Sequence, residues 1–182
     1  RISSADRTMR PQGKNQGDYQ MFKPTILGAG LLMGVASVAA ADGHVFGQEA
    51  GWNIINSEAL GGCLMEQTQD SGIQVQFGIN GKRELGYVAL FAREDLGLPD
   101  GETRIANFNI DGALFEGEGQ TVVTDGFEGG FLYFNNPNFI NDIINGQEMV
   151  ITTEAGTEVT VDLTGTKAAG DAVLACEAAN YG

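Results

Sequence analysis

The sequence predicts a mostly β protein: an antiparallel β-sandwich or barrel that carries a short helix and a C-terminal helix. Three observations indicate this class. Apolar and polar residues alternate in several short segments, turn dipeptides that contain glycine separate these segments, and only two segments near the C-terminal end have helical spacing. This order of elements is typical of a single β-rich domain, which we assign to residues 42–182 because that length can bury a core.

A dominant period of two, together with the turn signals between segments, predicts the strands, while residues 87–93 are apolar on both faces and are expected to form a central strand. The expected strands are residues 52–57, 63–69, 73–79, 87–93, 106–110, 114–123, 131–134, 149–154 and 159–163. The clearest is 73–79, where four apolar residues alternate with Gln74, Gln76 and Gly78, so that one face is expected to meet water. The dipeptide Asn80-Gly81 favours a tight hairpin after it.

Two helices are expected after the strand at 131–134. Asn136 is a good N-cap, Pro137 suits the first helical position, and Gly146 can end the helix. The second helix, residues 167–179, is expected to be capped by Thr166. One stripe of it, expected to face the sheet, consists of Ala169, Ala172, Val173 and Cys176.

The N-terminal part of the sequence has the features of an export signal. Residues 21–41 combine Lys23, a short apolar core and the small residues Ala39-Ala40-Ala41 before a cleavage point, which predicts a signal peptide and a mature start at Asp42. Residues 1–20 are polar and resemble upstream read-through or a disordered extension. We therefore expect a periplasmic or secreted protein that does not span the membrane after cleavage.

The predicted mature segment is strongly acidic. Five of the 10 basic residues but only two of the 24 acidic residues precede Asp42, which leaves 5 basic against 22 acidic residues and a formal charge of −17. Such a surface disfavours nucleic acid and anionic membranes. Cationic partners, divalent ions or simple solubility in a salty medium remain compatible with it. The partner that we expect is an envelope or extracellular protein.

The chain has two cysteines, Cys63 and Cys176. Because the signal peptide directs them to an oxidising compartment, we predict a disulfide between them. Two free thiols or a metal pair are the alternatives, and the second is disfavoured because His44 is the only histidine.

The end of the chain, GQEMVITTEAGTEVTVDLTGTKAAGDAVLAC, together with the signal peptide, Trp52 and Cys63, resembles the invasion-associated locus B family of small exported bacterial β-proteins. Proteins of this family resemble it in closing with two strands, a Leu-x-Gly step (here Leu163-Thr164-Gly165) and an Ala-rich helix. The chain lacks the second cysteine pair of that family. The resemblance implies an envelope protein, linked in some members to host-cell entry, with no catalytic residues to carry over.

Residues 107–118 have the spacing of a calcium loop. Asn107, Asn109 and Asp111 stand at positions 1, 3 and 5, Gly112 at position 6 and Glu118 at position 12. Against this interpretation, position 1 is not Asp, no helix is expected on either side, and a strand entering an Asp-Gly turn explains the same polar residues.

Other catalytic patterns are weaker. Asp70-Ser71-Gly72 resembles the aspartic-protease triplet but reads better as a hairpin turn. A serine hydrolase would need His44 with Ser57 or Ser71, and no nucleophile-elbow motif is present. A glycosidase-like pair of carboxylates cannot be nominated among so many acids.

The sequence thus nominates no catalytic, cofactor-binding or metal-binding residue. We expect an exported, non-catalytic envelope protein with a binding or structural role. The alternatives are a small periplasmic hydrolase that uses a carboxylate pair and a calcium-stabilised surface module. Aromatic residues in strands more often fill a core than line a ligand groove. The candidates for either role are Trp52, Tyr87, Phe91, Phe131, Tyr133 and Phe134.

Overall fold

The computed structural model describes residues 43–80, 85–93, 95–124 and 126–182, apart from the side chain of Pro137. The predicted signal peptide (21–41), the segment 1–20 and the second half of the Asn80-Gly81 turn lie outside these ranges. Within the described ranges, neither helix has the length and apolar character needed to cross a membrane.

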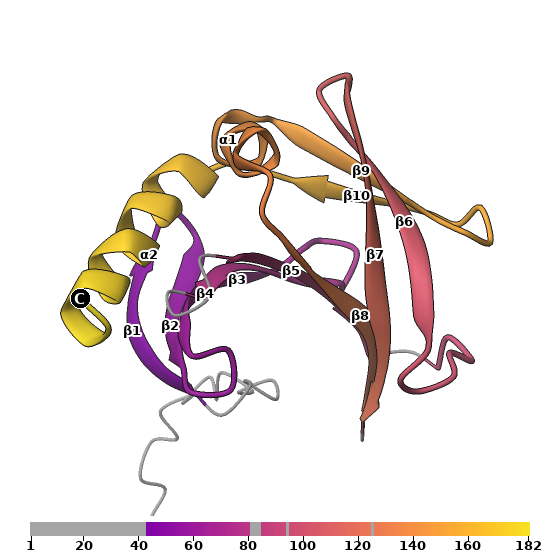
Figure 1. Ribbon diagram of the computed structural model, residues 1–182, viewed down its shortest axis with the longest axis horizontal. Helices are drawn as coiled ribbons and strands as arrows, with labels where there is room; N and C mark the ends of the chain where they lie inside the picture. Colours follow the sequence, from indigo (N-terminus) through magenta and orange to yellow (C-terminus); the bar gives the residue numbers. More distant parts are fainter. Residues whose placement is uncertain (1–42, 81–84, 94, 125) are drawn as a thin grey trace, which may run out of the picture. The chain divides into compact units, whose positions relative to one another are not determined.

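The described elements are ten strands and two helices (Figure 1). In chain order they are β1 (Gly43–Glu49), β2 (Trp52–Ser57), β3 (Gly62–Thr68), β4 (Gln74–Asn80), β5 (Leu85–Ala92), β6 (Thr103–Ile110), β7 (Ala113–Thr124), β8 (Phe127–Phe134), α1 (Pro137–Asn145), β9 (Glu148–Thr153), β10 (Glu158–Asp162) and α2 (Thr166–Asn180). The mostly β fold with a C-terminal helix is therefore confirmed. Sequence analysis missed β1, which pairs with β2 and contains His44.

All strands belong to one antiparallel sheet in the order β1-β2-β3-β4-β5-β8-β7-β6-β9-β10. Strands β1 to β5 follow the chain, but β5 pairs with β8 rather than β6, so the chain crosses over before the β6–β7–β8 meander. It crosses over again after β8, because β9 pairs with β6. Strand pairing does not close the sheet, since β1 and β10 stand at opposite ends of the order.

Side chains bridge the distance between these two ends. The indole Nε1 of Trp52 on β2 donates to the carbonyl oxygen of Thr164, 3.0 Å away. The backbone N–H of Asp162 donates to Oε1 of Gln69, which follows β3, at 2.9 Å. Helix α2, which follows β10, packs on β1, β2 and β3 (Figure 1).

Helix α1 forms where its signals predict. The Asn136 side chain accepts a hydrogen bond from the backbone N–H of Asn138 at 3.0 Å and caps the helix. The ring of Phe139, 3% exposed, anchors the helix on the sheet. It packs against three phenylalanine rings at centroid distances of 4.6–5.1 Å, those of Phe108, Phe115 and Phe134.

Helix α2 has the predicted buried stripe but not the predicted cap. Ala169, Val173 and Cys176 are buried against the sheet. The N-cap is Gly165, which has a left-handed backbone, and no side chain caps the helix. Thr166 is the first residue of α2, and its hydroxyl hydrogen-bonds to the carbonyl oxygens of Ile143 (2.9 Å) and Leu163 (2.8 Å), so it ties α2 to α1 rather than capping the helix.

The water-facing side expected for residues 73–79 is a second correction. Gln74 and Gln76 are each only 3% exposed, although they lie on the face of β4 opposite the core residues Val75 and Phe77. Hydrogen bonds within the protein replace those that the Gln76 side chain would make to water, because its amide donates to Glu66 and accepts from Tyr87. Both faces of this part of the sheet are consequently packed.

Candidate functional site

The C-terminal helix is fixed to the sheet by the predicted disulfide. Cys63 on β3 and Cys176 on α2 form a disulfide across 113 positions of sequence, with their Cα atoms 6.1 Å apart. The pairing predicted from the sequence is confirmed. The backbone N–H of Cys63 also donates to the carboxylate of Glu177, and the hydroxyl of Tyr181 donates to Oδ1 of Asn56 at 2.6 Å. These three contacts hold the last turns of the helix and its C-cap against β2 and β3.

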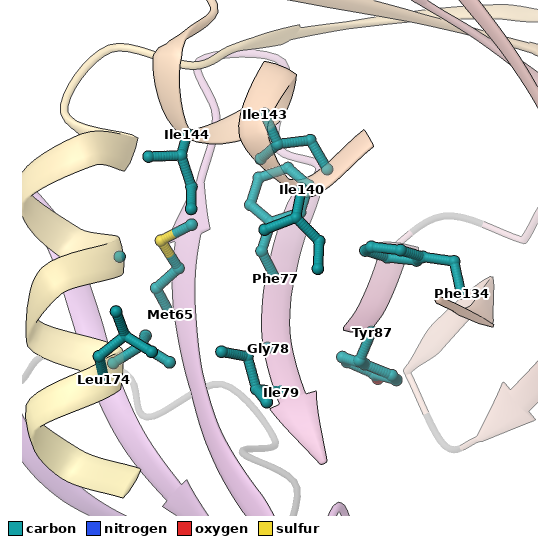
Figure 2. A pocket seen from close by; sticks show the side chains of 12 residues that line it. Met65, Phe77, Gly78, Ile79, Tyr87, Phe134, Ile140, Ile143, Ile144 and Leu174 are labelled. Atoms are coloured by element: carbon teal, nitrogen blue, oxygen red, sulfur yellow. The ribbon is translucent and has the colours of Figure 1, made fainter. Parts of the chain in front are cut away.

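An apolar cleft of about 160 Å³ opens between the two helices and the sheet (Figure 2). Figure 2 shows Ile140, Ile143 and Ile144 of α1 on one side and Leu174 of α2 on another. The sheet contributes the floor and the far wall. The described residues that line the cleft are Met65, Phe77, Gly78, Ile79, Tyr87, Phe134, Ile140, Ile143, Ile144, Gly170, Val173 and Leu174.

The chemistry of the cleft is that of a docking pocket for an apolar group. None of its described lining residues carries a charge, and Tyr87 is the only one with a polar side-chain atom. A cavity of similar size, about 150 Å³, lined by Leu, Ile and Phe binds benzene in another protein. Leu174, which is 54% exposed, marks the solvent side of the cleft, so an aromatic or aliphatic side chain of a partner could enter there.

A second hollow of about 130 Å³ lies on the sheet face that Gln76 and Glu66 share. Tyr87 of β5 pairs with Tyr133 of β8, and Phe131 lies two residues from Tyr133 on the same strand face. The centroids of these three rings are 5.6–6.1 Å apart. The lining is completed by Ser57, Ala59, Leu60 and Leu64.

A chain of buried polar groups runs from this hollow along the sheet. The hydroxyl of Tyr87 donates to Oε1 of Gln76 at 3.1 Å, and Nε2 of Gln76 donates to Oε2 of Glu66 at 2.7 Å. Burial of the phenol, with smaller contributions from Tyr133 and Glu66, raises the pKa of Tyr87 well above its ordinary value of 10. Tyr87 is therefore a neutral donor at any physiological pH.

Residues 107–118, which have the spacing of a calcium loop, form a β-hairpin with an Asp-Gly turn. Asn107 and Glu116 pair across β6 and β7, so the expected ligands are spread along two antiparallel strands instead of converging. The carboxylate of Asp111 accepts from the backbone N–H groups of Gln147 (2.8 Å) and Glu148 (3.2 Å), which joins the hairpin turn to β9. In the described part of the chain, no group of three or more His, Cys, Asp or Glu residues could hold a metal ion.

The structure also separates the residues of the weaker catalytic patterns. Asp70, Ser71 and Gly72 form the turn between β3 and β4, where Gly72 has a φ of +84°. Ser57 is buried, and its Oγ accepts from the backbone N–H of Leu60 at 3.2 Å. His44 pairs with Asn56, beside Ser57 on β2, but its side chain is exposed, so these two residues form no nucleophile–base pair.

A carboxylate pair suited to hydrolysis would contain one acid with a raised pKa. Asp162 has a lowered pKa instead, because hydrogen bonds from Thr164 favour the ionised form of this surface carboxyl at the end of β10.

The two hollows described above are lined mainly by apolar and aromatic groups. Sequence reasoning missed both hollows as sites, although it named Tyr87, Phe131 and Tyr133 as candidates for a groove.

Comparison with known proteins supports the fold. No family model matches the chain, and no curated protein matches it in sequence. A crystal structure of invasion associated protein B from Bartonella henselae is similar, with a TM-score of 0.53 and 16% sequence identity over 72% of this chain and 97% of that chain. At this identity the likeness concerns the fold and not the function. The chain thus has a fold loosely similar to that of invasion associated protein B.

Proposed function

We propose that this protein is exported to the bacterial envelope or beyond, where it binds another protein without catalysing a reaction. The Cys63–Cys176 disulfide is the observation that carries the proposal. It joins the only two cysteines of the chain, and disulfides persist mainly in oxidising compartments. The signal-peptide features of residues 21–41 and the fold similarity to invasion associated protein B support the same location, outside the cytoplasm.

The apolar cleft between α1 and α2 supports the binding role. Soluble proteins rarely leave a preformed hollow lined by this many isoleucine, phenylalanine and methionine side chains without a use for it. The disulfide holds one wall of the cleft in place, since Val173 and Leu174 lie within one turn of Cys176. A rigid wall lowers the entropy cost of binding a partner.

The export part of the proposal is tested by the thiol state of the protein in cells. A maleimide that adds mass to free thiols, applied to denatured extracts, should label no cysteine in the full chain before reduction and two after it. A matched chain without residues 21–41 should remain in the cytoplasm with two labelled cysteines. Reduced cysteines in the full chain, or its retention in the cytoplasm, would contradict export.

The binding part is tested by photo-crosslinking from the edge of the cleft. A photoreactive residue at Leu174 should give one discrete adduct with another protein, and the added substitution Ile144→Asp should abolish it by placing a charge in the cleft. The matched control is the same photoreactive residue at Leu114, which is 77% exposed on β7 and does not line the cleft. Equal adducts from both positions would show unspecific contact and remove the cleft from the proposal.

A further inference from the structure

The aromatic hollow on the opposite sheet face differs in chemistry from the cleft. Three rings in contact with one another are part of its lining: Tyr133 is 38% exposed, and the planes of Phe131 and Tyr133 meet at 77°. The ring of Tyr87 lies at 33° to Phe131 and 49° to Tyr133. Aromatic rings have a negative face, and an organic cation that lies over such a face is attracted to it.

The charge around the hollow favours the same class of ligand. Glu66 is 6% exposed, and its carboxylate is connected to Tyr87 through Gln76. Among the described residues, the ion pairs are those of Arg104 with Glu102 and Glu154, so none of them neutralises Glu66. A buried carboxylate that pairs with no cation of the described residues lowers the electrostatic potential of its surroundings, and the chain as a whole carries a formal charge of −14.

The same pair of strands already contains one contact of this kind. Cζ of Arg93, which follows β5, lies 5.2 Å from the ring centroid of Phe127 at the start of β8. A hollow of about 130 Å³ accommodates one planar guanidinium group with its last methylene groups, by comparison with the benzene-sized cavity above. The tyrosine hydroxyl oxygens can accept N–H groups from a guanidinium, which a quaternary ammonium lacks.

We propose that the hollow formed by Tyr87, Phe131 and Tyr133 binds the guanidinium group of an arginine side chain presented by a basic partner protein. This inference rests on the proposed binding function and names the chemistry of its partner. The arginine stacks on the rings, and the field of Glu66 adds to its attraction.

The first test is titration of the purified, oxidised protein with N-acetylarginine amide, followed by the NMR signals of the ring protons. The neutral control is N-acetylcitrulline amide, which has nearly the same shape but no charge. We expect saturable shifts at Tyr87, Phe131 and Tyr133 for arginine, and binding of citrulline about tenfold weaker or absent. Equal binding of both, or of neither, would overturn the proposal.

Substitutions in the hollow test whether arginine binds there. Tyr133→Leu and Phe131→Leu should each weaken arginine binding about three- to tenfold, and Glu66→Gln about two- to fivefold. The control is Phe46→Leu on β1, an aromatic residue that is 47% exposed and outside the hollow, which should leave the affinity unchanged. If Tyr133→Leu does not fold, Phe131→Leu and the comparison of arginine with citrulline still decide the question.

A titration with choline distinguishes a site for a guanidinium group from a site for a quaternary ammonium group. Binding of choline as tight as that of arginine, at the same ring protons, would overturn the assignment to arginine and make the ligand a quaternary ammonium. These titrations do not depend on export. A protein that remains in the cytoplasm but binds arginine would contradict only the proposed function, and an exported protein that does not bind it would contradict only this inference.

Discussion

Strand β4, in the region of β2–β4, and the β6–β7 hairpin both contain alternating sequences, but the two regions have opposite relations to water. On β3, every residue from Gly62 to Glu66 is buried. On β7, half-buried residues alternate strictly with exposed ones from Ala113 to Gln120. The first region has α2 fixed to one face by a disulfide and a hydrogen-bonded polar chain on the other, whereas the hairpin leaves one face in solvent.

The difference shows what alternation in sequence does and does not predict. Alternation identifies a strand and says which residues share a face. It does not say whether the polar face meets water, because polar residues can be buried when they satisfy one another, as Glu66, Gln76 and Tyr87 do. The stability of the protein should therefore depend far more on the first region than on the second.

The largest expected effect is loss of the disulfide, which would separate α2 from β3. In the chain-entropy model, a loop of this length contributes roughly 4 to 5 kcal/mol. We expect the double substitution Cys63→Ala and Cys176→Ala, or reduction of the native protein, to lower the free energy of unfolding by that order. Urea unfolding with and without reductant measures it, and a loss below about 1 kcal/mol would mean that the hydrogen bonds of Glu177 and Tyr181 suffice.

The next comparison sets one core ring against one exposed side chain of the hairpin. Phe77 on β4 is 4% exposed, packs on Trp52 at a centroid distance of 5.6 Å and lines the cleft. We expect Phe77→Ala to cost about 3–5 kcal/mol. Leu114→Ala should change stability by less than about 0.5 kcal/mol, since Leu114 is 77% exposed. Comparable losses in urea unfolding would show that the hairpin is packed in solution.

A smaller effect should appear at alkaline pH. Because the pKa of Tyr87 is raised above its ordinary value of 10, the unfolded chain releases this proton more readily than the folded protein. Stability from this difference is fully present below pH 10 and is lost as the pH rises from 10 toward the folded pKa. We expect Tyr87→Phe to be less stable at neutral pH but to show a shallower decline above pH 10.

Urea unfolding of both proteins between pH 8 and pH 11 measures this decline. Tyr133→Phe is the matched control, because it removes a hydroxyl from a half-exposed ring of the same cluster and keeps Tyr87. Equal pH slopes in the native protein and the Tyr87→Phe variant would contradict burial of the Tyr87 phenol.

The smallest expected effect concerns calcium. Since the carboxylate of Asp111 already accepts hydrogen bonds from Gln147 and Glu148, millimolar calcium or EDTA should leave the melting temperature unchanged. Asp111→Ala should cost about 1–2 kcal/mol with or without calcium, because two backbone donors lose their acceptor. A rise of several degrees with calcium, abolished by Asp111→Ala, would restore the calcium loop as a site.

Local signals allowed prediction of much of the fold. The segments around Phe77, Phe108 and Val161 alternate clearly, and each lies in a strand close to its expected bounds. The cap at Asn136 is a contact between near neighbours, so the sequence contains both of its partners. In contrast, β1 was missed because His44 and its neighbours show no clear alternation, and this strand exists through pairing with β2.

The candidate sites depended on long-range contacts. The cleft combines residues of β3, β4, β5 and β8 with residues of both helices, and the aromatic hollow depends on pairing of β5 with β8 across the crossover. No local pattern predicts that Tyr87 stands opposite Tyr133, because the register between distant strands is set by the packing of the whole sheet.

By itself, the sequence determined the fold class, most strands, both helices and the pairing of the two cysteines, because these follow from local periodicity, capping and the small number of partners. Only the tertiary structure decided that β8 joins β5, that Gln74 and Gln76 are buried and that two hollows lie beside Tyr87. Those features depend on contacts between residues far apart in the chain. Such contacts form only when the whole sheet and both helices pack together, so no local stretch of sequence predicts them.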